Sequence, residues 1–221
     1  MKKLMKDPLN LIIIGVAGQG NVVTSELVCN ALVREGYWVT FGQSYPAQQR
    51  GGPVVNYIRV SKETQYSPII PQGRADIIVA MEPVEAVRML AQYGNPDVIT
   101  MVNPRPIHAV DIAGTGARYP GLDKLLVDIK ELSAKTLVVN ATEEAQKLGA
   151  PIMANVILVG ALVGSGLLPL ERKSLEPVLR QRFPKAFEAN MAAFDKGVQL
   201  VRQAQEVTAT HLGPKYRGMR P

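Results

Sequence analysis

The stretch IIIGVAGQG, residues 12–20, places a short apolar run directly before a glycine-rich turn. Behind the turn, Val23, Leu27 and Ala31 recur at the spacing of one helix face. A buried strand, a glycine turn and a helix in this order are typical of the first unit of a dinucleotide-binding-type α/β domain. Glycines allow a tight turn and a close approach of the backbone, and the helix that follows offers unpaired N–H groups in its first turn.

Strand-like and helix-like segments alternate along the rest of the chain. The apolar runs predict strands at residues 10–16, 38–41, 54–60, 75–81, 97–102 and 136–139. Helical spacing predicts helices at residues 20–35, from 82 onward, and at 122–132, 152–163, 171–182 and 185–206. This alternation predicts an α/β fold with a Rossmann-like, mostly parallel sheet, helices on both faces of the sheet, and a helical C-terminal part.

The positive charge of the chain lies mainly at its two ends. The net charge is +6, and residues 207–221 contain Lys215, Arg217 and Arg220 but no acidic residue. Three lysines and one aspartate in residues 1–7 add to the imbalance. A nucleic-acid site needs basic residues clustered on the folded body, so we expect no nucleic-acid partner. We expect a single α/β domain at residues 1–206 and a basic tail at residues 207–221.

Few residues offer catalytic or metal-binding chemistry. The chain has one cysteine, Cys29, and two distant histidines, His108 and His211, so it can hold no disulfide, zinc site or cysteine-ligated cluster by itself. Cys29 lies within the first predicted helix, where a packing role is the simpler interpretation, and His108 is expected on a solvated loop. We therefore assign no catalytic residue and no metal ligand.

The sequence gives no sign of a membrane segment or a secretion signal. The chain starts with charged residues, and the apolar stretch 152–168 is interrupted by glycines and polar residues. We therefore expect a cytoplasmic protein that does not contact a membrane. Gly160 and Gly164 in the predicted helix 152–163 allow it to pack a second protomer in a homodimer, although burial in the core is the favoured interpretation.

Two features of the sequence disfavour a nicotinamide or flavin dinucleotide site. Such a site needs an acidic residue about 20 residues after the glycine turn, at the end of the second strand. Residues 38–44 contain no acidic residue, and Ala17 replaces the glycine that lets the backbone approach the pyrophosphate. No Gly-Lys-Ser/Thr follows the turn, so a nucleotide-hydrolysing phosphate loop is excluded as well.

The polar loop GQSYPAQQRGG, residues 42–52, is expected beside the glycine turn, because both follow strands at the same edge of the sheet. We predict that this edge receives a substrate, a cofactor tail or a partner subunit; the alternative is a solvated connection whose glycines serve only the turn. The candidate site residues are Gly15, Gly18, Gln19, Gly20, Gln49, Arg50, Gly51, Gly52 and Glu82. Arg50 is expected either to bind an anion such as a carboxylate or a phosphate, or to form a structural or intersubunit salt bridge.

Several longer motifs carry a resemblance to a known family. These are GVAGQG (15–20), AQQRGGPVVNYIRV (47–60), YSPIIPQGRADIIVAMEPVEAVRML (66–90), VNPRPI (102–107) and RFPKAFEANMAAFDKG (182–197). Together with NATEEAQKLGAP (140–151) and NVILVGALVG (155–164), they are distributed over residues 15–197, and the resemblance extends over roughly residues 9–203. The sequence resembles the gamma-type subunit of 2-oxoacid:ferredoxin oxidoreductases, and within this family the beta subunit of the indolepyruvate branch.

The resemblance implies a role as the small subunit of an enzyme that oxidatively decarboxylates a 2-oxoacid to an acyl-coenzyme A. In this family, thiamine diphosphate and iron–sulfur clusters lie on a larger partner subunit or domain, and electrons pass to ferredoxin. The resemblance thus implies no cofactor on this chain and coenzyme A in the complex. Two departures are Ala17 and the loop Tyr45-Pro46-Ala47-Gln48, which leave open an aryl 2-oxoacid other than indolepyruvate and a different electron acceptor. The alternatives are a free-standing dinucleotide-binding oxidoreductase and a regulatory binding protein of the same fold.

Overall fold

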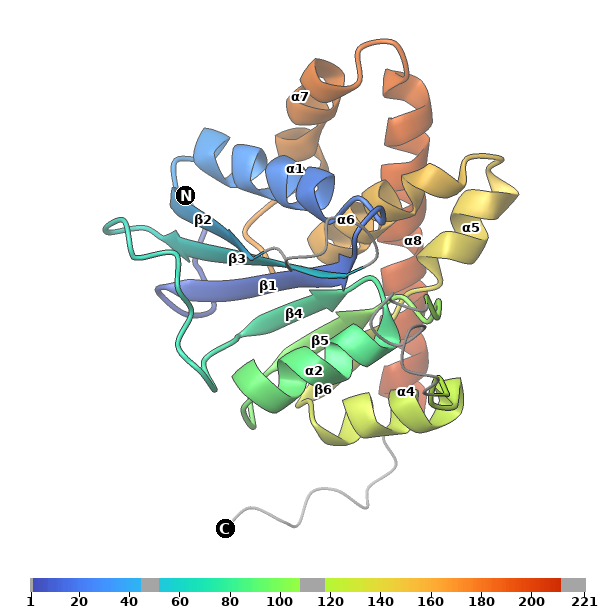
Figure 1. Cartoon of the computed structure of the whole chain (residues 1–221). Coiled ribbons are helices and arrows are strands. Elements are labelled where there is room, and N and C mark those ends of the chain that lie inside the picture. Colours follow the sequence, from blue (N-terminus) through green and yellow to red (C-terminus); the bar gives the residue numbers. More distant parts are fainter. Residues whose placement is uncertain (1, 45–51, 108–117, 212–221) are drawn as a thin grey trace.

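A six-stranded sheet forms the centre of the computed structural model, which describes residues 2–44, 52–107 and 118–211 (Figure 1). The strand order is β2-β3-β1-β4-β5-β6. The strands are β1 (Leu9–Val16), β2 (Trp38–Ser44), β3 (Pro53–Ser61), β4 (Ile77–Ala80), β5 (Ile99–Val102) and β6 (Lys135–Val138). All six lie within two or three residues of the predicted strands.

The sheet is mostly parallel, as predicted, with one reversed strand. β1, β4, β5 and β6 pair in parallel, whereas β3 runs antiparallel to both β1 and β2. A short connection between consecutive strands favours antiparallel pairing, while the parallel pairs need longer crossovers. β3 therefore separates β2 from β1, although the first two strands are direct neighbours in a dinucleotide-binding sheet.

Helices cover both faces of the sheet, as Figure 1 shows. They are α1 (Asn21–Arg34), α2 (Pro83–Tyr93), α4 (Leu122–Glu131), α5 (Ala141–Lys147), α6 (Ala154–Gly164), α7 (Arg172–Arg182) and α8 (Phe187–His211). Residues of β1 alternate between two cores: Leu11 and Ile13 face α1 and α6, whereas Ile12 and Ile14 face α2. The short helix α5 and the 3₁₀ turn Pro151–Met153 were not predicted from the sequence.

The helical C-terminal part is confirmed, and its centre is a close crossing of α6 and α8. A Cβ atom on Gly160 would lie 2.0 Å from the Phe194 carbonyl oxygen, and one on Gly197 would lie 1.9 Å from that of Ile157. Only glycine permits the two backbones to come this close. Residues 155–163 are all buried, so α6 packs inside its own chain, as favoured above.

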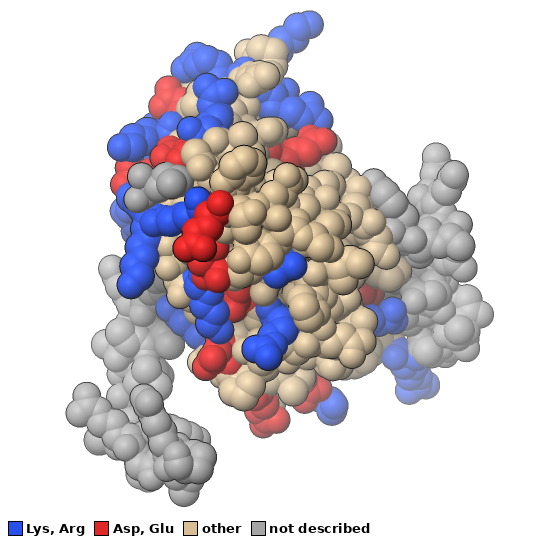
Figure 2. Space-filling model, turned by 90° about the vertical axis from the view of Figure 1, so that its left-hand side faces the viewer, with Lys and Arg blue, Asp and Glu red and all other residues tan. Residues whose placement is uncertain are grey.

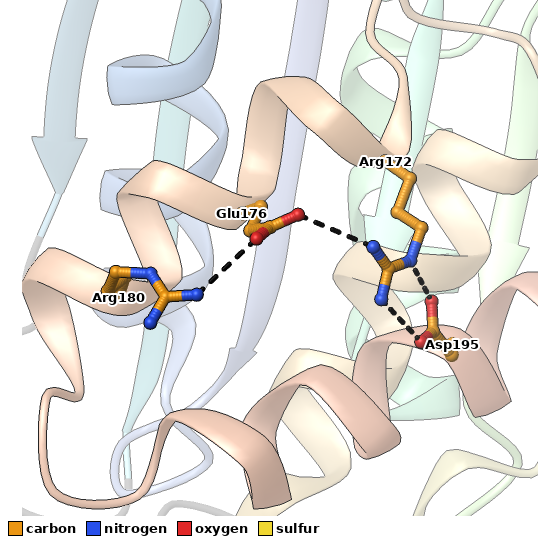
Figure 3. Close-up of polar contacts among 4 residues, drawn as sticks. All are labelled: Arg172, Glu176, Arg180 and Asp195. Atoms are coloured by element: carbon orange, nitrogen blue, oxygen red, sulfur yellow. Dashed lines mark hydrogen bonds and ion pairs between the residues drawn. The ribbon is translucent and has the colours of Figure 1, made fainter.

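Side-chain ion pairs connect α7 to α8 at the surface. The Arg172 guanidinium donates Nε to Asp195 Oδ1 at 2.8 Å and Nη2 to Asp195 Oδ2 at 3.0 Å, and it also approaches Glu176 (Figure 3). Arg180 contacts the other oxygen of Glu176 at 3.4 Å. The bidentate Arg172–Asp195 pair is the contact in this group that crosses between the two helices.

Candidate functional site

The glycine turn after β1 has a conformation that needs its glycines. Gly18 and Gly20 have φ angles of 99° and 84°, in the left-handed region that side chains disfavour. A Cβ atom on Gly15 would lie 2.6 Å from Asn21 Oδ1, and one on Gly20 would lie 2.6 Å from Asn155 Nδ2. The turn is thus packed tightly against α1 and the start of α6.

Gln19 braces this turn to the neighbouring strand. Its Oε1 accepts a hydrogen bond from the Val16 N–H at 2.7 Å, and its Nε2 donates to the Met81 carbonyl at 2.9 Å. Both ends of the amide are engaged in the fold. Gln19 therefore sets the position of the turn relative to the end of β4.

Asn103, which is not among the site residues predicted from the sequence, extends this bracing across the sheet edge. Its Nδ2 donates to the Met81 carbonyl at 3.2 Å and to Thr142 Oγ1 at 2.9 Å, while its Oδ1 accepts from the Thr142 N–H at 3.2 Å. The signal available in the sequence was a polar residue directly after a buried strand. The carboxyl ends of β1, β4, β5 and β6 are consequently joined by two amide side chains.

Glu82 lies at the same edge and is almost fully buried, with 1% of its surface exposed. Its Oε2 caps α2 by accepting from the Glu85 N–H at 2.9 Å. Its Oε1 accepts from the Tyr119 hydroxyl and from the Ile107 N–H at 3.4 Å. Burial, and then the hydrogen bond to Glu82, raise the pKa of Tyr119, so this residue remains a hydroxyl donor.

A crevice of about 570 Å³ opens beside these residues. Gly18, Gln19 and Gly20 form part of its wall, together with Asn103 and residues from α5 to α8. Two cations, Arg105 and Arg182, also line it, and Arg182 lies 3.6 Å from Glu26. Ile152 lines it too and is 84% exposed. The crevice thus combines an apolar interior with guanidinium and amide groups, which suits an elongated ligand with an anionic part.

The predicted site residues fall into two groups. Gly15, Gly18, Gln19, Gly20 and Glu82 lie together at this edge, and Gly52 joins them because its carbonyl accepts from the Ala17 N–H at 3.0 Å. Gln49, Arg50 and Gly51 lie outside the described residues. The glycine turn and Gly52 lie beside each other because β1 and β2 point in the same direction, with β3 running antiparallel between them.

The cysteine and the two histidines were considered as a nucleophile or as metal ligands. Cys29 is partly buried and packs against the larger core, and burial raises the pKa of its thiol to about 12. His108 lies outside the described residues, and so does the side chain of His211. Among the residues that the structure describes, no three His, Cys, Asp or Glu side chains are grouped to hold a metal ion.

Charges of both signs surround a broad uncharged area on the face shown in Figure 2. This mixture differs from the continuous basic surface that is typical of nucleic-acid binding. Within the described parts of the chain, no helix is both long and apolar enough to cross a membrane.

Comparisons with known proteins agree along almost the whole chain. The sequence model of the family "Pyruvate ferredoxin/flavodoxin oxidoreductase" matches residues 10–200. The indolepyruvate oxidoreductase subunit IorB of Pyrococcus horikoshii is 35% identical over 196 residues, which cover 88% of this chain and 96% of that protein. The corresponding subunit of Archaeoglobus fulgidus is 32% identical, with 86% and 93% covered. The fold is similar to that of a pyruvate oxidoreductase subunit from Thermotoga maritima, with a TM-score of 0.65, 21% identity, and 88% and 97% of the two chains covered.

Proposed function

This chain belongs to the pyruvate ferredoxin/flavodoxin oxidoreductase family, and we propose that it is the small subunit of an oxidoreductase that converts indolepyruvate or another aryl 2-oxoacid to an acyl-coenzyme A. The observation that carries this proposal is the match to indolepyruvate oxidoreductase subunits over nearly the full length of both proteins. Electrons leave the assembled enzyme through ferredoxin or another acceptor.

The redox cofactors belong to a larger partner subunit in this proposal. An iron–sulfur cluster is held by several cysteine thiolates, and the single Cys29 of this sequence does not fit such a cluster. Thiamine diphosphate, which supplies the carbanion-stabilising ylid, is assigned to the partner as well. The contribution of this chain is therefore to bind and orient a ligand at the partner's reaction centre.

Coenzyme A fits the crevice at the carboxyl edge of the sheet. Arg105 and Arg182 would hold its phosphates through charge-assisted hydrogen bonds, and the apolar lining would contact its uncharged arm. Arg50, for which anion binding is predicted from the sequence, is a further candidate for holding a phosphate. We also propose that residues 1–206 form the working α/β unit and residues 207–221 a basic tail, although α8 continues to His211.

The test is purification of the tagged chain from the cells that produce it, followed by viologen reduction with a series of aryl 2-oxoacids, with and without coenzyme A. We expect a large brown partner subunit and activity that depends on both substrates. The Arg50→Ala variant of the assembled enzyme should show a higher KM for coenzyme A or a lower turnover. A colourless chain that purifies alone and is inactive would contradict the subunit role and favour a regulatory binding protein.

A further inference from the structure

We propose that Glu82 is a positioning residue: it anchors the strap Asn103–Ile107 at its far end and thereby keeps Arg105 in the wall of the crevice. This inference rests on the proposed function, because it assigns to Arg105 the recognition of an anionic group of coenzyme A. Glu82 itself does not line the crevice and acts through the strap.

The strap has the sequence Asn103-Pro104-Arg105-Pro106-Ile107 and is stiff. Each proline fixes its own φ angle and pushes the residue before it toward an extended conformation. Arg105 is held between the two prolines, so its backbone has little freedom of its own. The direction in which Arg105 leaves the sheet is therefore set by the two ends of the strap.

The near end of the strap is fixed by the sheet. The Asn103 N–H donates to the Ala80 carbonyl at 2.9 Å, and the Asn103 side chain makes the amide contacts to Met81 and Thr142. The prolines cannot donate backbone hydrogen bonds. Within the described part of the chain, the backbone hydrogen bond of the far end runs from the Ile107 N–H to Glu82 Oε1.

The two oxygens of Glu82 carry two separate functions. Oε2 caps α2 at the Glu85 N–H, whereas Oε1 receives the far end of the strap and the Tyr119 hydroxyl. Because Glu82 is 1% exposed, water does not compete effectively for this oxygen. One buried carboxylate thus ties the strap to the start of α2, and α2 packs directly on the sheet through Ala86 and Leu90.

The guanidinium group of Arg105 is available to bind a ligand in the crevice. Its side chain is exposed at the crevice, and none of the described residues forms an ion pair with it. Arg182, by contrast, already lies 3.6 Å from a carboxylate oxygen of Glu26. An arginine with a fixed backbone, whose guanidinium forms no ion pair with any described residue, is suited to binding a phosphate.

Glu82→Asp separates the two functions of the carboxylate. Aspartate is a preferred N-cap residue and keeps the cap of α2, but its shorter side chain cannot also reach Ile107 and Tyr119. Tyr119→Phe removes one of the Oε1 contacts, together with the contact between the hydroxyl and the Val84 backbone, and leaves the hydrogen bond from the Glu85 N–H to Oε2 in place. Arg74→Ala, at the opposite edge of the sheet, is the matched control for the charge change in Arg105→Ala.

The experiment measures the Kd of coenzyme A by calorimetry on the assembled enzyme without 2-oxoacid, and in parallel kcat and KM for coenzyme A. We expect Arg105→Ala and Glu82→Asp each to raise Kd and KM about five- to tenfold, since each removes or misplaces one charge-assisted contact. Tyr119→Phe should give a smaller increase in the same direction, while kcat and the unfolding midpoint change little. The Glu82→Asp/Arg105→Ala double variant should bind no more weakly than Arg105→Ala, because both changes act on the same contact.

Two different results would overturn two different claims. If Arg105→Ala weakens binding but Glu82→Asp does not, or if the two effects multiply in the double variant, Glu82 does not act through Arg105 and this inference is wrong. If Arg105→Ala binds coenzyme A as tightly as Arg74→Ala, the crevice is not the coenzyme A site. In that case the ligand assignment made under the proposed function fails, and the inference fails with it.

Discussion

Cys29 illustrates how packing decides the chemistry of a single side chain. It lies on α1 against the larger core, and burial together with the nearby Glu26 charge raises the pKa of its thiol to about 12. Since the thiolate is the reactive form, the folded chain offers almost no nucleophile at neutral pH. This agrees with the interpretation of Cys29 as a packing residue.

We therefore expect Cys29 to resist iodoacetamide in the folded chain at about pH 8 and to react more than about a hundredfold faster after unfolding in guanidinium. Mass spectrometry of quenched samples measures both rates, and Cys29→Ala controls for modification elsewhere. Similar rates in the two states would mean that the thiol is accessible and ionised in the native protein.

Residue types predicted the glycine turn itself better than they predicted the side-chain hydrogen bonds that hold it in place. Gly18 and Gly20 follow from the turn geometry, because a positive φ angle selects glycine in any sequence. Gln19 and Asn103 were harder to interpret, since their hydrogen-bond partners lie on other strands. Gln19 and Met81 are 62 residues apart in the sequence, but Gln19 Nε2 donates to the Met81 carbonyl oxygen at 2.9 Å in the fold.

At the level of elements, the crossing of α6 and α8 depends on small side chains on both helices. We expect Gly197→Ala to lower the free energy of unfolding by about 3 kcal/mol or more, because its Cβ would lie 1.9 Å from the Ile157 carbonyl oxygen and must force the helices apart. Urea unfolding measures this loss. Gly121→Ala is the control, since its Cβ would meet nothing within 4 Å. Equal stability of the two variants would show that the helices can separate without cost.

A second contact between elements depends on pH. Hydrogen bonds from Lys147 and then from Lys196 lower the pKa of Glu144, and the Lys196 contact, at 2.8 Å, ties α5 to α8. A lowered carboxyl pKa stabilises the fold above the ordinary glutamate pKa, and this contribution is lost as the pH falls through the lowered pKa.

Glu144→Gln should therefore cost about 1 kcal/mol or less at pH 7, and progressively less below the ordinary glutamate pKa, which is about 4.3. Chemical unfolding of both proteins over this pH range tests the expectation. Glu143→Gln is the matched control because its carboxylate contacts Lys147 on the same helix and does not reach α8. A loss that stays constant with pH would assign the stability to packing instead of charge.

For the whole molecule, the spacing of apolar residues along the sequence was sufficient to predict the strands and most helices. Apolar runs and helical spacing are local signals, so β1 to β6 and the C-terminal helices could be located from the sequence. The reversed direction of β3 could not, because pairing depends on contacts between distant residues. The short α5 was missed for a different reason: its seven residues give too little periodicity. The crevice depends on several such long-range placements, which is why Asn103 and Arg105 became apparent only in the fold.

The order of the elements also has a consequence for synthesis on the ribosome. α6 is apolar and buried along residues 155–163, and the helix that crosses it, α8, is the last element of the described chain. Before α8 has emerged, a nascent chain therefore presents the complete sheet and an α6 whose α8-facing side is exposed, and this apolar surface is a target for chaperones. Products that terminate before α8 keep the same surface exposed permanently. Proteolytic quality control can thus distinguish truncated chains from finished ones before any of them meets a partner subunit.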